Sequence, residues 1–170
     1  MIRIEFSDNP NEELKSWMIN LIEENARGDY ETSEEGWDRD KKLREISHPE
    51  AKYLYVYHSD NAILPIGFSH YRIEDEERLK GGTRKVLYIY EIHFMAQYTG
   101  KGFGSTLMEN LEQLGSQNGV SDLMLTVFKR NNYALSFYKK RGFIKDELSP
   151  EDKSYMILSK PMRRRRIKYI

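Results

Sequence analysis

Cysteine is absent from the 170 residues of this chain. The chain therefore has no disulfide, no thiolate metal site and no cysteine nucleophile. Long apolar runs are missing too, because none approaches the ~20 residues that a membrane-spanning helix needs. The opening segment, MIRIEFSDNP, lacks the apolar stretch of a secretion signal. We therefore expect a protein of the nucleus and cytoplasm that does not associate with membranes.

Net charge is absent as well, because 27 basic residues balance 27 acidic ones. This balance disfavours binding of nucleic acid through overall charge, and we expect no sequence-specific nucleic-acid partner. The four histidines show no metal-ligand spacing, so we predict no metal. Two runs depart from the balance, the acidic Glu74–Glu77 and the basic Arg163–Arg166. Either could be a solvated patch, and the basic run could instead guide the protein to DNA or to the nucleus.

The length predicts one domain over residues 1–170, with residues 161–170 as a basic tail. Spacing of apolar residues and turn formers predicts the elements in order. We expect a helix that starts at Asp8–Pro10 and ends at Gly28, a short helix from about Glu34, a hairpin of strands Tyr53–Tyr57 and Ile66–Ile73, a charged loop over Glu74–Lys85, a strand over Val86–Met95, a helix over Ser105–Leu114, a strand over Leu123–Lys129, a helix over Asn132–Arg141, a loop over residues 144–153 and a final strand over Ser154–Ser159. The alternation of strands and helices in the second half predicts an α/β fold.

The stretch from Val86 to Glu112 is the most informative part of the chain. An apolar, β-branched and aromatic strand runs into a turn that contains Gly100, Gly102 and Gly104, and a helix follows. Such a turn lets the backbone approach a phosphate closely, and the first N–H groups of the helix point at the anion. A tight strand-to-helix connection would give the same pattern, so the turn alone does not decide.

A second segment, Asn131–Phe143 (NNYALSFYKKRGF), strengthens the interpretation. Together the two segments resemble the GNAT superfamily of N-acetyltransferases, which carries an Arg/Gln-x-x-Gly-x-Gly/Ala turn for the acetyl-CoA pyrophosphate and an Asn…Ala…Phe-Tyr…Gly-Phe helix beside it. The turn matches in two registers. Gln97 with Gly100 and Gly102 fits literally, whereas pairing Gly102 with Gly104 puts Thr99 in the Arg/Gln position. We favour the second register because it sets the last glycine directly against the helix.

The chain is more closely similar to one branch, the NatD-type N-terminal acetyltransferases of histones. The segments that carry this resemblance cover most of residues 30–160. They are Tyr30-Glu31, Gly36-Trp37, Phe68–Arg72 (FSHYR), Val86–Glu91 (VLYIYE), Met124–Lys129 (MLTVFK), Ser154-Tyr155 and Ile157–Ser159.

The resemblance implies the GNAT acyl-CoA N-acyltransferase fold, a mixed, twisted central sheet flanked by helices. Two parallel strands, here Val86–Met95 and Leu123–Lys129, would splay apart to admit the pantetheine arm of acetyl-CoA. The implied enzyme is a monomer that acetylates the free N-terminal amine of histones H-four and H-two-A, which begin Ser-Gly-Arg-Gly, by direct attack in a ternary complex. Two alternatives remain: a GNAT enzyme that acts on lysine or a small amine, and a silent module that binds acyl-CoA or histone tails.

Glu91 is our candidate for the general base, acting directly or through a water. A carboxylate in an apolar strand is costly unless it is functional or paired at the strand end. Strand alternation puts Tyr88 and Tyr90 on one face and Glu91 on the other. All three reach one pocket only if the strand bulges, so we predict a β-bulge near Tyr90–His93. One backbone N–H released there could serve as the oxyanion donor.

The other site residues follow from the resemblance, and each has a structural alternative. The tyrosines could be core residues, Asn131 a helix cap, Tyr138 a packing partner of Phe137, and Lys101 a solvated side chain. The acidic pair Glu74 and Glu76 would hold the arginine of the substrate. The full sets are Glu91, Tyr90 and Tyr138 for catalysis; Tyr30, Glu74, Glu76, Tyr88, Tyr90, Thr126, Ser149 and Tyr155 for substrate binding; and Ile92, His93, Phe94, Gly100, Lys101, Gly102, Phe103, Gly104, Ser105 and Asn131 for cofactor binding.

Overall fold

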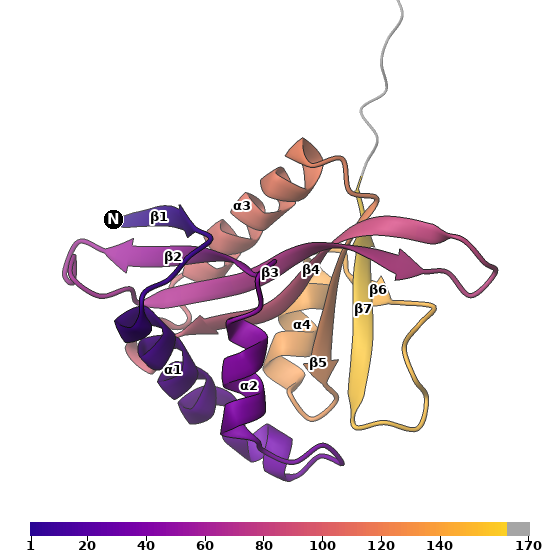
Figure 1. Cartoon of the computed structure of the whole chain (residues 1–170), viewed down its shortest axis with the longest axis horizontal. Coiled ribbons are helices and arrows are strands. Elements are labelled where there is room, and N and C mark those ends of the chain that lie inside the picture. The colour runs from indigo at the N-terminus through magenta and orange to yellow at the C-terminus, as the bar shows by residue number, and fades with distance from the viewer. Residues whose placement is uncertain (163–170) are drawn as a thin grey trace, which may run out of the picture.

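A computed structural model describes residues 1–162 of the chain. Within this range, strands form one sheet in the order β1-β2-β3-β4-β5-β7-β6 (Figure 1). Neighbouring strands are antiparallel except β4 and β5, which are parallel. The elements are β1 (Ile2–Ser7), α1 (Glu12–Glu31), α2 (Arg39–Ile46), β2 (Lys52–His58), β3 (Gly67–Glu77), β4 (Thr83–Phe94), the 3₁₀ turn η1 (Ala96–Tyr98), α3 (Phe103–Gln117), β5 (Asp122–Phe128), α4 (Asn132–Lys140), β6 (Ile144–Lys145) and β7 (Tyr155–Pro161).

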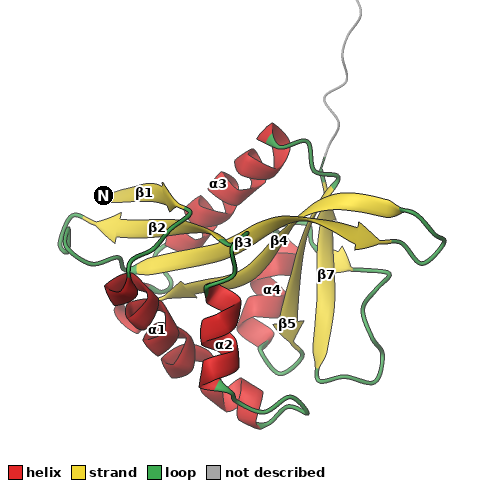
Figure 2. Ribbon diagram, viewed as in Figure 1, coloured by secondary structure: helices red, strands yellow, loops and turns green. Residues whose placement is uncertain are grey.

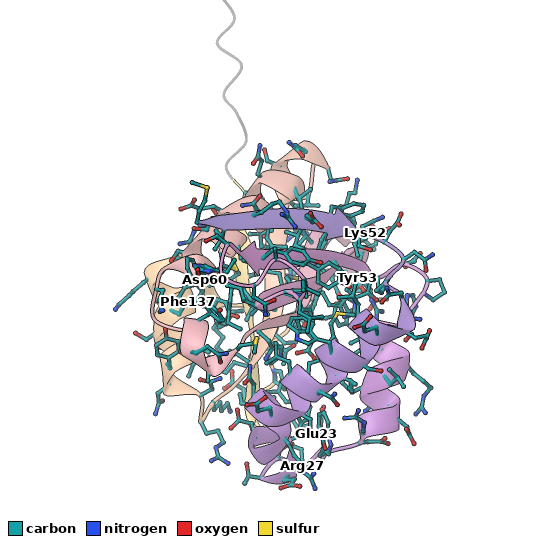
Figure 3. The ribbon with its side chains drawn as sticks, turned by 90° about the vertical axis from the view of Figure 1, so that its left-hand side faces the viewer. Glu23, Arg27, Lys52, Tyr53, Asp60 and Phe137 are labelled. Atoms are coloured by element: carbon teal, nitrogen blue, oxygen red, sulfur yellow. The ribbon has the colours of Figure 1, made fainter. Side chains whose placement is uncertain are left out.

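The sheet is covered by helices on both faces, α1 and α2 on one and α3 and α4 on the other (Figure 1). Alternation along β2 divides its side chains between two cores: Tyr53 and Tyr55 pack with α1 and α2, whereas Leu54 and Val56 pack in the core that includes α3. In the side view of Figure 3, Phe137 of α4 lies on the left and Glu23 and Arg27 of α1 lie at the bottom of the molecule. The mixed α/β fold predicted from the sequence is confirmed.

Several expected elements are confirmed in kind and corrected in extent. The β2–β3 hairpin, the organising strand, both later helices and the final strand are present. Gly28 does not end the first helix, which Asn11 caps and which continues to Glu31. The expected charged loop over Glu74–Lys85 is largely strand, because β3 and β4 extend into the long hairpin visible in Figure 2. The second helix starts at Arg39 rather than near Glu34.

Strands β1 and β6 lie outside the expected elements. The alternating sequence of β1 pairs with Tyr53 to His58 of β2, and β6 adds two residues to the edge beyond β7. No helix within residues 1–162 is both long enough and apolar enough to cross a membrane. The basic run Arg163–Arg166 lies outside the described residues.

A β-bulge interrupts β4 where the sequence analysis predicted it. His70 of β3 pairs with Glu91 while the next residue, Tyr71, pairs with Ile89, so Tyr90 has no partner in the register. An inserted residue reverses the alternation that follows it. Glu91 and His93 therefore point to the α1–α2 face, the same face as Tyr88 and Tyr90, whereas Ile92 and Phe94 pack against the core on the other face.

The two parallel strands separate just before this bulge. Pairing between β4 and β5 runs from Val86 with Asp122 to Ile89 with Leu125 and then ends, although both strands continue. The splay predicted between these strands is thus present.

Two glycines give a matched test of the packing beside the bulge. A Cβ at Gly67 would lie 2.8 Å from the His93 carbonyl oxygen and 2.4 Å from the Phe94 ring, whereas a Cβ at Gly28 would meet nothing within 4 Å. We expect Gly67→Ala to lower the free energy of unfolding by about 1–3 kcal/mol through overpacking. Gly28→Ala, inside α1, is expected to raise it by about 0.5–1 kcal/mol. Urea denaturation measures both, and equal effects of the two changes would contradict this account.

Candidate active site

A cleft of about 660 Å³ opens where β4 and β5 part. Its walls come from the ends of these two strands, the second half of α1, the turn before α3 and the start of α4. The described residues that line it and were predicted as site residues are Tyr30, Tyr90, Glu91, Ile92, His93, Phe94, Gly100, Gly102, Phe103, Gly104, Ser105, Thr126, Asn131 and Tyr138.

The glycine turn offers backbone donors to this cleft. Gly100 and Gly102 have φ values of 71° and 82°, which side chains disfavour, and Gly102 caps α3. Gly104 lies in the first turn of the helix, where a Cβ would be 3.7 Å from Phe137. Within residues 1–162, the N–H groups from Gly100 to Ser105 have no hydrogen-bond acceptor. Gly100 and Gly102 thus shape the turn and Gly104 is the second residue of α3, while the register that would bind the pyrophosphate stays a prediction.

Helix α4 brings two predicted residues to the opposite wall. The Asn131 side chain accepts the Ala134 N–H at 3.1 Å, so it caps α4 as well as lining the cleft. Tyr138 packs its ring edge-on against Phe137 and Phe143, with centroids 5.3 and 5.5 Å away. Its hydroxyl makes no hydrogen bond to any residue in the range 1–162. Burial raises the pKa of Tyr138, so its hydroxyl keeps its proton at neutral pH.

Glu91 is held by a partner on each carboxylate oxygen. Oε1 accepts a hydrogen bond from Lys42 Nζ at 2.7 Å, and Oε2 lies 2.6 Å from His93 Nε2. Burial alone would raise the pKa of Glu91, but Lys42 and His93 outweigh burial and lower the pKa to about 2. The carboxylate is therefore ionised throughout the physiological range.

Lys42 of α2 was not identified from the sequence. It is 7% exposed, pairs with Glu45 at 3.0 Å as well as with Glu91, and lies 5.0 Å from the centroid of the Tyr30 ring. Although burial opposes the charge, Glu91, Tyr30 and Glu45 raise the pKa of Lys42. A carboxylate predicted inside a strand implies that a cation lies near it in the fold. Lys42 is 49 residues away in the sequence, however, and no local sequence pattern marks it as that cation.

Most of the residues predicted to bind substrate lie together on the α1–α2 face of the sheet. The Tyr88 hydroxyl is 2.5 Å from Thr126 Oγ1, and the Tyr90 hydroxyl donates to Glu74. Burial raises the pKa of Tyr88 to about 12, with further contributions from nearby Glu76, Glu74 and Tyr155. The sequence therefore identified a cluster that four different strands bring into one place.

Six predicted residues do not line the cleft: Glu74, Glu76, Tyr88 and Tyr155 of the strand cluster, and Ser149 and Lys101, which lie elsewhere. Ser149 lies in the β6–β7 connection, where its hydroxyl accepts the Ile157 N–H at 3.0 Å, so its contacts organise that connection. Lys101 is exposed in the glycine turn, 5.8 Å from the centroid of the Tyr98 ring. Conversely, Asn25 and Asp29 of α1 line the cleft without having been predicted. No group of three or more metal-ligating His, Asp or Glu side chains forms within residues 1–162.

Two contacts join loops to neighbouring elements beside the cleft. Glu34, after α1, accepts a hydrogen bond from the Ser154 N–H at 3.0 Å, which joins the α1–α2 loop to the start of β7. Arg130, after β5, pairs with Asp29 of α1 at 3.2 Å. The approach to Glu91 from this side therefore passes between segments that contact each other.

Comparison with known proteins gives a consistent result. A profile described as the acetyltransferase (GNAT) family matches residues 17–143. Among solved structures, the NatC complex bound to Gag peptide and CoA contains a chain 18% identical to this one, with a TM-score of 0.67 over 95% of this chain and 99% of that one.

Two further structures give similar values. The PaiA N-acetyltransferase from Thermoplasma acidophilum in complex with coenzyme A is 22% identical, with a TM-score of 0.66 over 94% of this chain and 99% of that one. The ribosomal-protein alanine N-acetyltransferase from Escherichia coli is 15% identical, with a TM-score of 0.62 over 99% of each chain. At these sequence identities, the similarity to the three solved structures shows only that the fold is shared.

His70, beside the site, makes the stability depend on pH. Its ring stacks on Tyr90 with centroids 4.9 Å apart, and its Nε2 accepts a hydrogen bond from Arg72 Nε at 3.2 Å. Burial, followed by the charge of Arg72, lowers the pKa of His70 to about 3. In the unfolded chain, where a histidine has a pKa near ~6.5, His70 takes up a proton below this pH, whereas in the folded protein it stays neutral until a much lower pH. Stability is therefore full above pH ~6.5 and falls as the pH drops toward 3.

We expect this single group to cost about 1.4 kcal/mol per pH unit below pH ~6. His70→Gln should remove that part of the slope in urea unfolding measured from pH 7 to pH 4.5. Parallel stability curves for wild type and His70→Gln would show that His70 is not the origin.

Proposed function

Because the chain belongs to the acetyltransferase (GNAT) family, we propose that it acetylates the N-terminal α-amine of protein chains that begin like histones H-four and H-two-A, with acetyl-CoA as donor. The observation that carries the proposal is the end of pairing between β4 and β5 after Ile89 and Leu125. It creates a cleft that two substrates can enter from opposite faces of the sheet. Holding both reactants there makes the reaction effectively unimolecular, which lowers the barrier by several kcal/mol, on the order of 7–11 at best.

The donor side of the cleft fits acetyl-CoA. The unpaired N–H groups from Gly100 to Ser105 form a cradle for its pyrophosphate at the positive end of the α3 dipole. Beyond Ile89, the edge of β4 that faces β5 has no strand partner within residues 1–162, and Ile92 to Phe94 line the cleft there. This edge can bind the amides of the pantetheine arm as a neighbouring strand would. Acetyl-CoA supplies the thioester, and in this proposal Tyr138, which lines the cleft, gives a proton to the departing sulfur.

The acceptor side favours an amine that is easily deprotonated. An α-amine with a pKa near ~8 is about one-fifth neutral at pH 7.4, whereas a lysine with a pKa near ~10.4 is neutral in about one molecule in a thousand. A carboxylate held at a pKa of about 2, as Glu91 is, draws a proton only weakly. The contacts between Glu34 and Ser154 and between Arg130 and Asp29 narrow the approach. Both features favour a chain end over a lysine side chain.

The acidic pair on β3 supports an arginine near the start of the substrate. Glu76 forms no ion pair within residues 1–162, and burial together with Glu74 raises its pKa, so a cation beside it would be stabilised. The nearest strand partner, Arg84, is committed to Asp146 at 2.7 Å. An incoming guanidinium could therefore bind Glu76 without breaking an existing pair.

Three short peptides test the proposal. We expect the enzyme to acetylate Ser-Gly-Arg-Gly with a free N-terminus, and to leave unmodified both the same peptide with a blocked N-terminus and a blocked peptide that contains lysine. Mass spectrometry identifies the modified nitrogen. Acetylation of the lysine peptide at a similar rate would instead favour the lysine or small-amine alternative.

Charge removal at Glu76 tests recognition of the arginine. We expect Glu76→Gln to raise KM for the Ser-Gly-Arg-Gly peptide about tenfold or more, the usual effect of losing a charge-assisted hydrogen bond. KM for Ser-Gly-Ala-Gly should not change. Asp75→Asn, the exposed neighbour on the opposite face of β3, serves as control and should leave both values unaltered. Equal changes on the two peptides would place the arginine elsewhere.

A further inference from the structure

Lys42 lies behind the cleft rather than in it. Glu91 and Tyr30 both line the cleft, whereas Lys42 does not. Its Nζ is 2.7 Å from Glu91 Oε1 and 5.0 Å from the centroid of the Tyr30 ring, and only 7% of the residue is exposed. A substrate in the cleft therefore meets the carboxylate and the ring, but not the ammonium group that contacts both of them.

The Lys42 ammonium group has partners on three elements. Besides Glu91 of β4 and Tyr30 of α1, it pairs with Glu45 of its own helix at 3.0 Å. Helix α2 is in turn held against the sheet, because Arg72 of β3 donates a hydrogen bond to the Glu45 carbonyl oxygen at 2.7 Å. The position of Lys42 is thus set by the fold rather than by a substrate.

The Glu91 carboxylate keeps a lone pair on each oxygen. Lys42 takes one acceptor position on Oε1 and His93 takes one on Oε2, and each carboxylate oxygen has a further acceptor position. The two partners restrict rotation of the carboxylate, so the remaining lone pairs have a fixed direction. Because Glu91 lines the cleft, such a group can take the proton of an amine, directly or through a water.

We propose that Lys42 is a positioning residue for acetyl transfer, which orients the Glu91 carboxylate for the amine proton. This inference rests on the proposed function, with Glu91 as the base. The amine nitrogen forms the N–C bond to the acetyl carbon, and the C–S bond breaks with its electron pair on sulfur. Glu91 takes the amine proton, Tyr138 gives its hydroxyl proton to the sulfur, and exchange with solvent restores both side chains.

The same contact keeps the buried carboxylate charged. Burial raises the pKa of Glu91, and Lys42 and His93 outweigh burial. Without Lys42, one of the two groups that offset burial would be gone, so the pKa of Glu91 would rise. The other ionisable groups around the carboxylate are Asp29 and Tyr30 from α1, Glu45 from α2, His70 and Arg72 from β3, and Tyr138 from α4.

Replacement of Lys42 tests the proposal by its separate effects on kcat and KM. With the Ser-Gly-Arg-Gly peptide, we expect Lys42→Met to lower kcat by about tenfold to 10²-fold, because the base loses its fixed position. KM should change by less than about threefold, since the Tyr30 ring also packs against Trp37 and Phe128, with centroids 5.5 and 5.0 Å away.

Lys160→Met is the matched control. Lys160 of β7 pairs with Glu112 of α3 at 2.8 Å, an ion pair between a strand and a helix that does not line the cleft. Its replacement should leave both kcat and KM unchanged. A Lys42→Met enzyme whose kcat lies within about threefold of wild type would overturn the proposal.

A double variant shows whether Lys42 acts through Glu91. We expect Glu91→Gln to lower kcat about 10²–10⁴-fold, and Lys42→Met added to it to lower kcat by less than about threefold further, because residues that act as one unit are not additive. The double variant leaves neither charge of the pair buried alone, so it keeps the proposal testable where Lys42→Met by itself does not fold. Losses that multiply would show that Lys42 acts independently of Glu91 and would overturn the proposal.

A titration that needs no turnover separates this inference from the proposed function. In ¹³C NMR of the side-chain carboxyls without substrate, the signal that disappears in Glu91→Gln is that of Glu91. Lys42→Met should move the midpoint of this signal upward by about 1–3 pH units, whereas Lys160→Met should leave it in place. Failure of wild type to acetylate any of the peptides would refute the proposed function alone. A Glu91 midpoint that is the same in Lys42→Met as in wild type would refute the role of Lys42.

Discussion

The candidate site depends on one buried ion pair, between Lys42 of α2 and Glu91 of β4. Loss of either partner would leave the other charge buried, which typically costs about 3–5 kcal/mol. An apolar pair of similar volume would often be at least as stable, so stability alone is a weak reason for the charges. Their effect is instead local. They fix an anion beside His93 and hold α2, with its contact to Tyr30, against the edge of the cleft.

The splay of β4 and β5 opens the cleft beside this ion pair. A sheet that stops pairing in its middle leaves backbone donors and acceptors without partners, which a sealed interior would not tolerate. Here the same opening faces the N-terminus of α3, where the N–H groups from Gly100 to Ser105 are also unpaired within the described range. Two sets of unsatisfied backbone groups thus converge on one volume, and a ligand with phosphate at one end and amides along its length satisfies both.

Local patterns predicted the parts of this arrangement that are local. The strand, glycine turn and helix of Val86–Glu112 follow from composition and spacing, and the bulge follows from requiring Tyr90 and Glu91 in one pocket. Gly28 was misjudged because packing of α1 on the sheet outweighs the ~1 kcal/mol cost of glycine in a helix. Lys42 could not be predicted in the same way. Its role exists only once the fold brings α2 over β4, and its own neighbours in the sequence are ordinary solvated charges.

The bulge determines the face of the sheet to which the Glu91 side chain points. Without the extra residue at Tyr90, alternation would turn Glu91 to the side of Leu87 and Ile89, which pack in the apolar core with α3. No described cation lies in that core to balance a carboxylate, and burial would drive it to take up a proton. With the bulge, Glu91 meets Lys42 and His93 follows on the same face. Glu91 therefore reaches Lys42 only because of the bulge. Without Lys42, the bulge would leave the charge of Glu91 buried without this cation.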